Sequence, residues 1–278
     1  MVSVYPELGA RVGRLFRQQA DGGIFDYLVP LDTTHYDVER WPRAGCFPML
    51  PFTNKFAGNV FTWHGQQVRV ADDPEAGFLH GWGLRHAWSV EASGDAHCAL
   101  SLRVAASDMW PWDYEARLMI QLDANGANFT LSLINRSHTP MPAGLGFHPH
   151  FPLHGGAKAR VQADARWQTT SESAGLPAVR DRLAEPLHLN IDGGGLPGAV
   201  STWFCETSCC AAELRYPASG RELRVSSRDA RYMVLHAPLS GRYVCLEPSS
   251  HLAGRLDPSA DVAQPDQTVT LSMRIEAI

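Results

Sequence analysis

Lysine is scarce in this sequence, and positive charge comes almost entirely from arginine. Of the 24 Lys and Arg residues only Lys55 and Lys158 are lysines, and the net charge of -5 corresponds to a pI near 6.2. No run of basic residues interleaved with aromatics is present, so the chain offers no cationic field for a phosphate backbone. We therefore expect no nucleic-acid partner. Lys55 merits scrutiny, because it is not one of many solvating surface lysines.

Long apolar runs and paired cysteine motifs are also missing. No stretch approaches the roughly 20 apolar residues of a membrane span, and the first residues lack a basic segment followed by an apolar one. We expect a soluble cytoplasmic protein without a membrane partner. The six cysteines form no C-x-x-C pair, and Cys209 and Cys210 are adjacent. This spacing suits neither a disulfide framework nor a zinc ribbon and predicts reduced, mostly buried thiols.

The sequence has no convincing amphipathic helix, no G-x-G-x-x-G and no P-loop, which disfavours nucleotide-binding α/β folds. Its dominant period is two, as in half-buried antiparallel strands. Residues 268–276 alternate apolar and polar side chains, as do segments beginning at Cys98, Leu118 and Phe129. Pro217 to Gly220 supplies turn chemistry for a hairpin. We expect one all-β domain over residues 1–278, with residues 171–198 irregular and a glycine loop at 193–195.

Four short segments place polar side chains among apolar or glycine-rich neighbours. They are residues 45–58 with Asn54 and Lys55, residues 78–83 with His80 and Trp82, residues 144–152 with His148 and His150, and residues 243–250 with Glu247. Each segment taken singly also fits an ordinary loop or strand end. In an extended chain Cys245 and Glu247 share one face and Pro248 ends the ladder, so Glu247 could be a general base at a cleft rim.

The H-x-H pattern of His148 and His150, with His154 nearby, also raises a metal site. Side chains two residues apart in an extended strand point to the same face, as metal ligands can. No Asp or Glu lies within this cluster to complete the ligand set, and Pro149 makes the backbone irregular. We therefore expect no metal and keep a cupin-like metal enzyme as a third alternative.

Six motifs occur in the order found in one enzyme family and extend over nearly the whole chain. They are Leu8-Gly9-Ala10-Arg11-Val12-Gly13, Phe47-Pro-x-x-Pro-x-x-Asn54-Lys55, Leu79-His80-Gly81, Trp110-Pro-Trp112, Gly146-Phe-His148-Pro-x-Phe151 and Leu246-Glu247-Pro248. The chain thereby resembles aldose 1-epimerases, most closely the shorter bacterial mutarotase-like branch.

The resemblance implies a β-supersandwich of long antiparallel sheets with a monosaccharide in an open cleft. It implies an aldose 1-epimerase that interconverts the α and β anomers of a hexose without a cofactor, as a monomer or homodimer. By similarity Glu247 is the general base, His148 the general acid and His80 a second histidine that binds the sugar near its ring oxygen. Asn54 and Lys55 would contact sugar hydroxyls. Trp82, Trp110 and Trp112 could stack on the pyranose.

Two positions depart from the family pattern. Lys55 replaces an arginine that could donate two parallel hydrogen bonds, which puts substrate choice in question. The family also has an aspartate on the cleft, for which both Asp192 and Thr202 remain open.

Two alternatives share the expected fold. The first is a hexose-6-phosphate 1-epimerase, for which Arg85, Arg228 and Arg231 could supply the cationic groups. The second is a non-catalytic carbohydrate-binding or sensor protein.

Overall fold

The computed structural model describes residues 1–19, 21–40, 42–73, 77–198, 200–239 and 241–278 of the chain. It is built almost wholly of antiparallel strands, so the all-β expectation is confirmed. None of the helices within the described ranges is long and apolar enough to cross a membrane.

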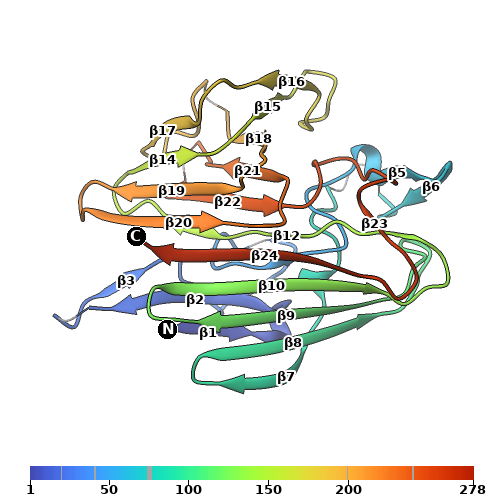
Figure 1. Cartoon of the computed structure of the whole chain (residues 1–278), viewed down its shortest axis with the longest axis horizontal. Coiled ribbons are helices and arrows are strands. Elements are labelled where there is room, and N and C mark those ends of the chain that lie inside the picture. The colour runs from blue at the N-terminus through green and yellow to red at the C-terminus, as the bar shows by residue number, and fades with distance from the viewer. Residues whose placement is uncertain (20, 41, 74–76, 199, 240) are drawn as a thin grey trace.

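The larger sheet has nine strands and contains the longest ones (Figure 1). The C-terminal strand lies between the tenth and twentieth strands, so it joins the two halves of the chain in one sheet. In order across the sheet the strands are β17 (Leu187–Ile191), β14 (Ala157–Val161), β19 (Ala211–Tyr216), β20 (Arg221–Ser226), β24 (Thr268–Ala277), β10 (Gly126–Asn135), β9 (Tyr114–Leu122), β8 (His97–Val104) and β7 (Ser89–Gly94).

The second sheet carries most of the polar residues singled out from the sequence. Its order is β16 (Val179–Arg182), β15 (Ala165–Gln168), β18 (Thr202–Glu206), β21 (Tyr232–His236), β22 (Tyr243–Ser249), β12 (Gly146–Phe147) and β4 (Pro48–Met49), and β13 (His150–Pro152) also pairs with β22. Both β12 and β13 pair with β22, so the chain on either side of His148 is fixed to the strand that holds Glu247.

The remaining elements form a three-stranded sheet, two strand pairs and three single helical turns. They are β1 (Val2–Tyr5), β2 (Arg11–Gln18) and β3 (Ile24–Asp26) in one sheet, the pairs β5 (Val60–Trp63) with β6 (Gln66–Arg69) and β11 (Met141–Pro142) with β23 (Val262–Ala263), and the 3-10 helices η1 (Pro6–Leu8), η2 (Ala57–Asn59) and η3 (Gly83–Arg85).

The main core lies between the two large sheets. Phe129 of β10 packs against Phe147 of β12 with ring centroids 5.9 Å apart, and Leu235 and Leu246 belong to the same buried cluster. Because strand side chains alternate, the neighbours of these leucines face the other side of the second sheet. Thus Val234 and Glu247 project away from the main core.

The predicted alternation and hairpin are confirmed in detail. Leu271, Met273 and Ile275 of β24 are buried, and β19 and β20 pair up to Tyr216 and Arg221 on either side of the predicted turn. The expectation of an irregular segment at 171–198 was wrong in part, because this segment contains β16 and β17. Each is a short strand at the edge of a large sheet; β16 is mostly exposed, and β17 alternates apolar and polar residues over five positions only. Residues 193–195 form the predicted loop.

Candidate active site

A cavity of about 190 Å³ opens on the face of the second sheet that points away from the main core. Its lining combines four imidazoles, one carboxyl group and one guanidinium with few apolar groups. The lining residues are Arg43, Asn54, Leu79, His80, His148, His150, Thr202, Val234, His236, Tyr243 and Glu247. A larger hollow on the outer face of β7 to β9 contains Arg103 and Glu115, which pair with each other. The smaller cavity therefore has the groups that can do acid and base chemistry.

The register of strands β18, β21 and β22 determines which side chains form one wall of this cavity. Val234 pairs with Glu247 between β21 and β22, and Thr202 pairs with His236 between β18 and β21. Directly opposed residues share a face of a sheet, so the side chains of these pairs line the same surface. The Thr202 hydroxyl and the His236 Nδ1 atom are 2.9 Å apart, which links the two neighbouring strands at the cavity wall.

Glu247 and His148 meet in this cavity although 98 residues separate them in the sequence. Glu247 Oε1 lies 3.5 Å from His148 Nε2, and both side chains are almost fully buried. The backbone N–H of His148 donates to the Phe47 carbonyl at 3.0 Å, which fixes the residue between β12 and β13. The ring of His148 stacks on Phe47 and on His150, with centroids 4.8 and 4.7 Å away.

Burial sets the protonation of this pair. Removal from water raises the pKa of Glu247 to about 8 and lowers the pKa of His148 well below its ordinary value. Desolvation disfavours the charged form of each group, so a carboxyl and an imidazole shift in opposite directions. Near neutral pH the pair therefore holds one proton, and the shift directions favour its residence on Glu247.

His80 completes the reactive wall, and its tautomer follows from its hydrogen bonds. The backbone N–H of Asn54 donates to His80 Nδ1 at 3.0 Å, and the backbone N–H of His80 donates to the Asn54 carbonyl at 2.8 Å. Burial lowers the His80 pKa well below its ordinary value, so the ring is neutral. Because Nδ1 accepts, the single ring proton lies on Nε2, where it can be donated. The His80 ring is 5.1 Å from that of His148.

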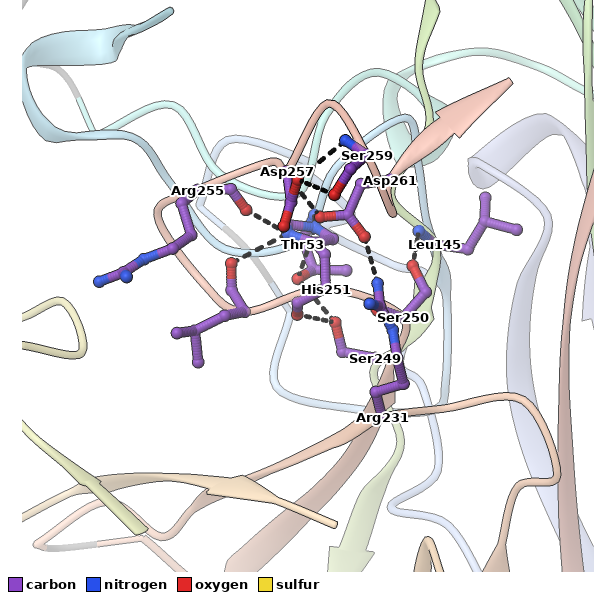
Figure 2. A network of polar contacts seen from close by, with 11 residues as sticks. Thr53, Leu145, Arg231, Ser249, Ser250, His251, Arg255, Asp257, Ser259 and Asp261 are labelled. Carbon is purple, nitrogen blue, oxygen red and sulfur yellow. Dashed lines mark hydrogen bonds and ion pairs between the residues drawn. The ribbon is translucent and has the colours of Figure 1, made fainter. Parts of the chain in front are cut away.

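The segment that holds Asn54 is fixed by a buried polar network centred on His251 (Figure 2). His251 Nδ1 lies 2.9 Å from the carbonyls of both Leu252 and Arg255, so it carries the ring proton and donates. His251 Nε2 then accepts from the backbone N–H of Thr53 at 2.8 Å. Thr53 immediately precedes Asn54, so the network reaches His80 through one residue of backbone.

Further hydrogen bonds and an ion pair drawn in Figure 2 hold the loop around His251 in place. The guanidinium of Arg231 pairs with Asp261 and donates to the Ser250 carbonyl at 2.8 Å. The Ser249 hydroxyl donates to the His251 carbonyl at 2.8 Å. The strand end after Glu247 and the segment before Asn54 are thus connected by hydrogen bonds.

Several predicted residues lie beside the cavity rather than in its lining. Lys55 is half-buried next to Asn54 but is not among the lining residues. Trp82 packs against Phe52 with ring centroids 5.7 Å apart, and Trp110 and Trp112 are buried against each other. Trp110 and Trp112 are therefore part of the main core cluster, and the partly buried Trp82 packs against that cluster.

The structure separates the two residues considered for the family's aspartate position. Asp192 is exposed in the glycine loop, where its carboxylate accepts from the Gly194 N–H at 3.1 Å, and it does not line the cavity. Thr202 does line it. The cavity therefore has a neutral hydroxyl, and not a carboxylate, on this wall.

The three arginines considered for a phosphate group also lie elsewhere. Arg85 pairs with Glu39 and donates to the carbonyls of Leu79 and Gly81, so it holds the segment around His80. Arg231 belongs to the network of Figure 2, and Arg228 lines a hollow beside β10 and β24.

Sequence reasoning missed three polar lining residues, which are Arg43, His236 and Tyr243. His236 ends the apolar strand β21 just as Glu247 comes late in the apolar strand β22, so the same pattern could have found it. Arg43 lies in a Pro-Arg-Ala-Gly segment with no periodicity, and nothing in its surroundings distinguishes it from a surface arginine.

The metal alternative can be tested against donor geometry. One donor atom from each of His148, His150 and Cys245 lies within 4.8 Å of the others. The two imidazoles are stacked with only 16° between their planes, so their lone pairs lie in nearly parallel planes that do not meet at one ion. Burial also raises the pKa of the Cys245 thiol, whereas a metal binds the thiolate. This donor set fits a metal ion poorly.

Comparisons with known proteins identify one family by a family model and one fold by solved structures. A family model described as aldose 1-epimerase matches residues 1–258. The uncharacterized protein YphB of Escherichia coli (strain K12) is 33% identical over 127 residues, which is 45% of this chain and 42% of YphB. The alignment thus spans less than half the length of that relative.

Solved structures match over the whole chain. The galactose 1-epimerase from Lactobacillus acidophilus NCFM superposes with a TM-score of 0.79 at 15% identity and covers 100% of this chain and 90% of its own. A galactose mutarotase-like protein from Clostridium acetobutylicum gives a TM-score of 0.78 at 15% identity, with 100% and 92% covered. At such low identity these likenesses show a shared fold.

Proposed function

This chain belongs to the aldose 1-epimerase family, and from that premise we propose that it interconverts the α and β anomers of a monosaccharide. The observation that carries the proposal is the meeting of Glu247, His148 and His80 in one cavity, with Glu247 Oε1 3.5 Å from His148 Nε2. Opening a hemiacetal ring requires a base at one oxygen and an acid at the other. A buried carboxyl and a buried imidazole that share one proton can supply both.

In the proposed reaction the pair begins with Glu247 ionised and His148 protonated. Glu247 takes the proton of the anomeric hydroxyl, the C1–O1 double bond forms, and the C1–O5 bond breaks with its electrons going to O5. His148 gives its proton to O5, and the Nε2–H of His80 donates a hydrogen bond to the same oxygen. Rotation about C1–C2 then presents the other face of the aldehyde. In the closing step O5 bonds to C1 and returns its proton to His148, while the C1–O1 double bond becomes single and O1 takes the proton of Glu247.

The proton count of this cycle matches that of the free site. The pair carries one proton whether it is written as neutral Glu247 with neutral His148 or as an ion pair, and 3.5 Å separates the two atoms that exchange it. Sugar hydroxyls that donate to the carboxylate replace the water lost on burial and favour the ion pair. Only protons are transferred, so the proposed reaction uses no cofactor. Action in the cytoplasm as a monomer or homodimer stays a prediction from the sequence.

The test is anomer exchange of a sugar panel measured by polarimetry or NMR. We expect Glu247→Gln to lower the accelerated rate by about 10²- to 10⁴-fold, since it removes one proton-transfer group and little volume. Sugar binding should persist. Glu172→Gln, at an exposed site outside the cavity, is the matched control and should leave the rate unchanged. Unchanged turnover in Glu247→Gln would reject Glu247 as the base, and binding without acceleration by the wild type would indicate a sensor.

A further inference from the structure

His236 lines the candidate active site, and the proposed reaction gives it no part. On β21 it lies two residues after Val234, which pairs with Glu247 of β22. Side chains two residues apart on a strand share a face, so His236 and Glu247 project on the same side of the sheet as diagonal neighbours. The Cα atoms of such neighbours are roughly 7–8 Å apart. One bound monosaccharide can therefore contact both residues.

Strand order separates the groups on the two sides of Glu247. Its strand, β22, has β21 on one side and both β12 and β13 on the other. His148 lies between β12 and β13, and in the proposed reaction it acts at the ring oxygen while Glu247 acts at the anomeric hydroxyl. A sugar held in this way has its ring oxygen on the side of β12 and β13. The groups left to contact β21 are then hydroxyls on ring carbons.

Thr202 fixes the ring of His236 through one of its two nitrogens. Thr202 pairs directly with His236 across β18 and β21, and its hydroxyl oxygen is 2.9 Å from His236 Nδ1. Nε2 lies on the edge of the ring that is farther from the backbone, and the ring forms no other hydrogen bond within the described part of the chain. Because His236 is partly exposed and lines the cavity, Nε2 is available to a ligand there.

The pair of Thr202 and His236 can both donate and accept. Burial, with a smaller effect of the Arg43 charge, lowers the pKa of His236, so its ring is neutral near pH 7. A neutral imidazole has one N–H and one acceptor nitrogen. If the Thr202 hydroxyl donates to Nδ1, Nε2 carries the proton and donates; if Nδ1 donates to Thr202, Nε2 accepts and the threonine hydroxyl donates. Either arrangement suits a sugar hydroxyl, which is itself donor and acceptor, whereas a carboxylate only accepts.

We propose that His236 binds a hydroxyl on a ring carbon of the sugar through Nε2, and that Thr202 positions the imidazole for this contact. The inference rests on the proposed function, because the placement of the anomeric end at Glu247 and His148 determines which part of the sugar faces β21. It makes His236 a binding residue and Thr202 a positioning residue. The sugars that this site selects are those with a hydroxyl on the contacted carbon.

The experiment compares sugars with and without each hydroxyl. Calorimetric titration of the wild-type protein uses glucose, galactose and 2-, 3- and 4-deoxyglucose. We expect one deoxy sugar to bind about 3- to 10-fold more weakly than glucose, which is the range for one neutral hydrogen bond. His236→Asn should weaken glucose binding by a similar factor and should not weaken that deoxy sugar further, because each change removes one partner of the same bond.

Two substitutions of His236 distinguish sugar binding from a structural role. The amide of His236→Asn lies at the level of Nδ1 and can still reach Thr202, whereas the amide of His236→Gln lies at the level of Nε2 and can reach the sugar. We therefore expect glutamine to retain more of the glucose affinity. If the ring served only to join β18 and β21, asparagine would be the better substitute. His188→Asn, at an exposed position of β17 outside the cavity lining, is the matched control and should bind as the wild type does.

Variants of Thr202 test the positioning. Thr202→Val keeps the shape of the side chain and removes the hydroxyl, so we expect weaker glucose binding, and Thr202→Ser should restore most of it. Thr270→Val is the matched control, because the Thr270 hydroxyl also joins two strands, at 3.2 Å from that of Ser132, but lies outside the cavity lining. Full affinity in Thr202→Val would reject the positioning role.

The inference and the proposed function fail in different ways. Titration measures the hydroxyl contact whether or not the sugar is turned over, and anomer exchange measures the epimerase. In an active enzyme His236→Asn should raise KM and leave kcat nearly unchanged, since the contact is made equally before and during ring opening. Equal binding of all deoxy sugars, or asparagine performing as well as glutamine, would overturn the inference. Dependence on one hydroxyl without accelerated exchange would keep the contact and reject the epimerase.

Discussion

Glu247 and His148 derive their chemistry from burial. In water a carboxyl group is ionised at neutral pH, and an imidazole with its ordinary pKa near 6.5 is partly protonated there. In the cavity, desolvation favours the neutral form of both Glu247 and His148. Their side-chain atoms are 3.5 Å apart, so the two groups can exchange one proton. Two groups whose environments push their pKa values apart are what acid and base catalysis near neutrality requires.

The pH dependence of activity follows from this pair. The singly protonated state exists between the lowered pKa of His148 and the Glu247 pKa of about 8. We expect kcat/KM to be level between about pH 6.5 and pH 7.5 and to fall about tenfold per unit well above pH 8, as the shared proton is lost. The measurement is anomer exchange in buffers of matched ionic strength. A rate that keeps rising through pH 9 would contradict the assignment.

At the scale of elements, the site depends on two loops that contact each other at a glycine. Gly81 adopts φ +67°, and a Cβ built there would lie 2.2 Å from the Leu50 carbonyl oxygen. The N–H groups of Trp82 and Gly83 donate to that same carbonyl. The close approach of the two segments sets the position of His80 opposite Asn54, where both residues have positive φ.

Gly81→Ala should therefore damage both stability and activity. The methyl group adds backbone strain and a clash with backbone atoms that cannot rotate away, which together cost about 2 kcal/mol or more. Gly58→Ala is the matched control, since its φ is +60° but no atom lies within 4 Å of the built Cβ. We expect a clearly smaller loss of unfolding free energy in urea and little loss of anomer exchange for the control. Equal effects of both variants would show that the contact with Leu50 is unimportant.

The loop after β22 acts on the site through His251. In His251→Phe the ring volume stays, but the Thr53 N–H and the carbonyls of Leu252 and Arg255 lose their partner. Each unsatisfied buried group costs about 1–3 kcal/mol. We expect lower stability together with a changed NMR signature of the His80 ring nitrogens, because the Asn54 N–H shifts. His188→Phe at an exposed position of β17 is the control. Unaltered His80 resonances in His251→Phe would refute the proposed coupling from His251 to His80 through the Thr53–Asn54 backbone.

For the whole molecule, the buried histidines make stability depend on pH. Burial lowers the pKa values of His80, His148, His150 and His251 in the folded state. A group with a lowered folded pKa contributes stability above its unfolded pKa, near 6.5, and this contribution is lost as the pH falls.

We therefore expect the unfolding free energy to fall steeply below about pH 6.5. Each of these four histidines changes the unfolding free energy by at most about 1.4 kcal/mol per pH unit, and their contributions have the same sign. Chemical denaturation from pH 8 down to pH 5 measures the slope. Glu247 acts in the opposite sense, because its raised pKa costs stability as the pH rises toward 8. Glu247→Gln should thus unfold at higher temperature than the wild type at pH 8, and a free energy independent of pH would disprove this account.

The sequence alone was sufficient for the class of fold and for the residues with distinctive local patterns. Two-residue alternation is a property of neighbouring side chains, so strands such as β10 and β24 could be predicted without knowing their partners. The edge strands β16 and β17 were missed, because β16 is mostly exposed and has no alternation, and the alternation of β17 covers only five residues.

Tertiary structure decided which polar residues share one cavity. His148 and Glu247 meet because β12 and β13 both pair with β22, and Thr202 replaces Asp192 in the lining because strand register places it opposite His236. Arg43 had no local signal at all, since only the fold brings its segment to the cavity that it lines. Local sequence fixes the period of each strand, whereas register between distant strands and the burial it produces determine which groups meet and which of them hold protons.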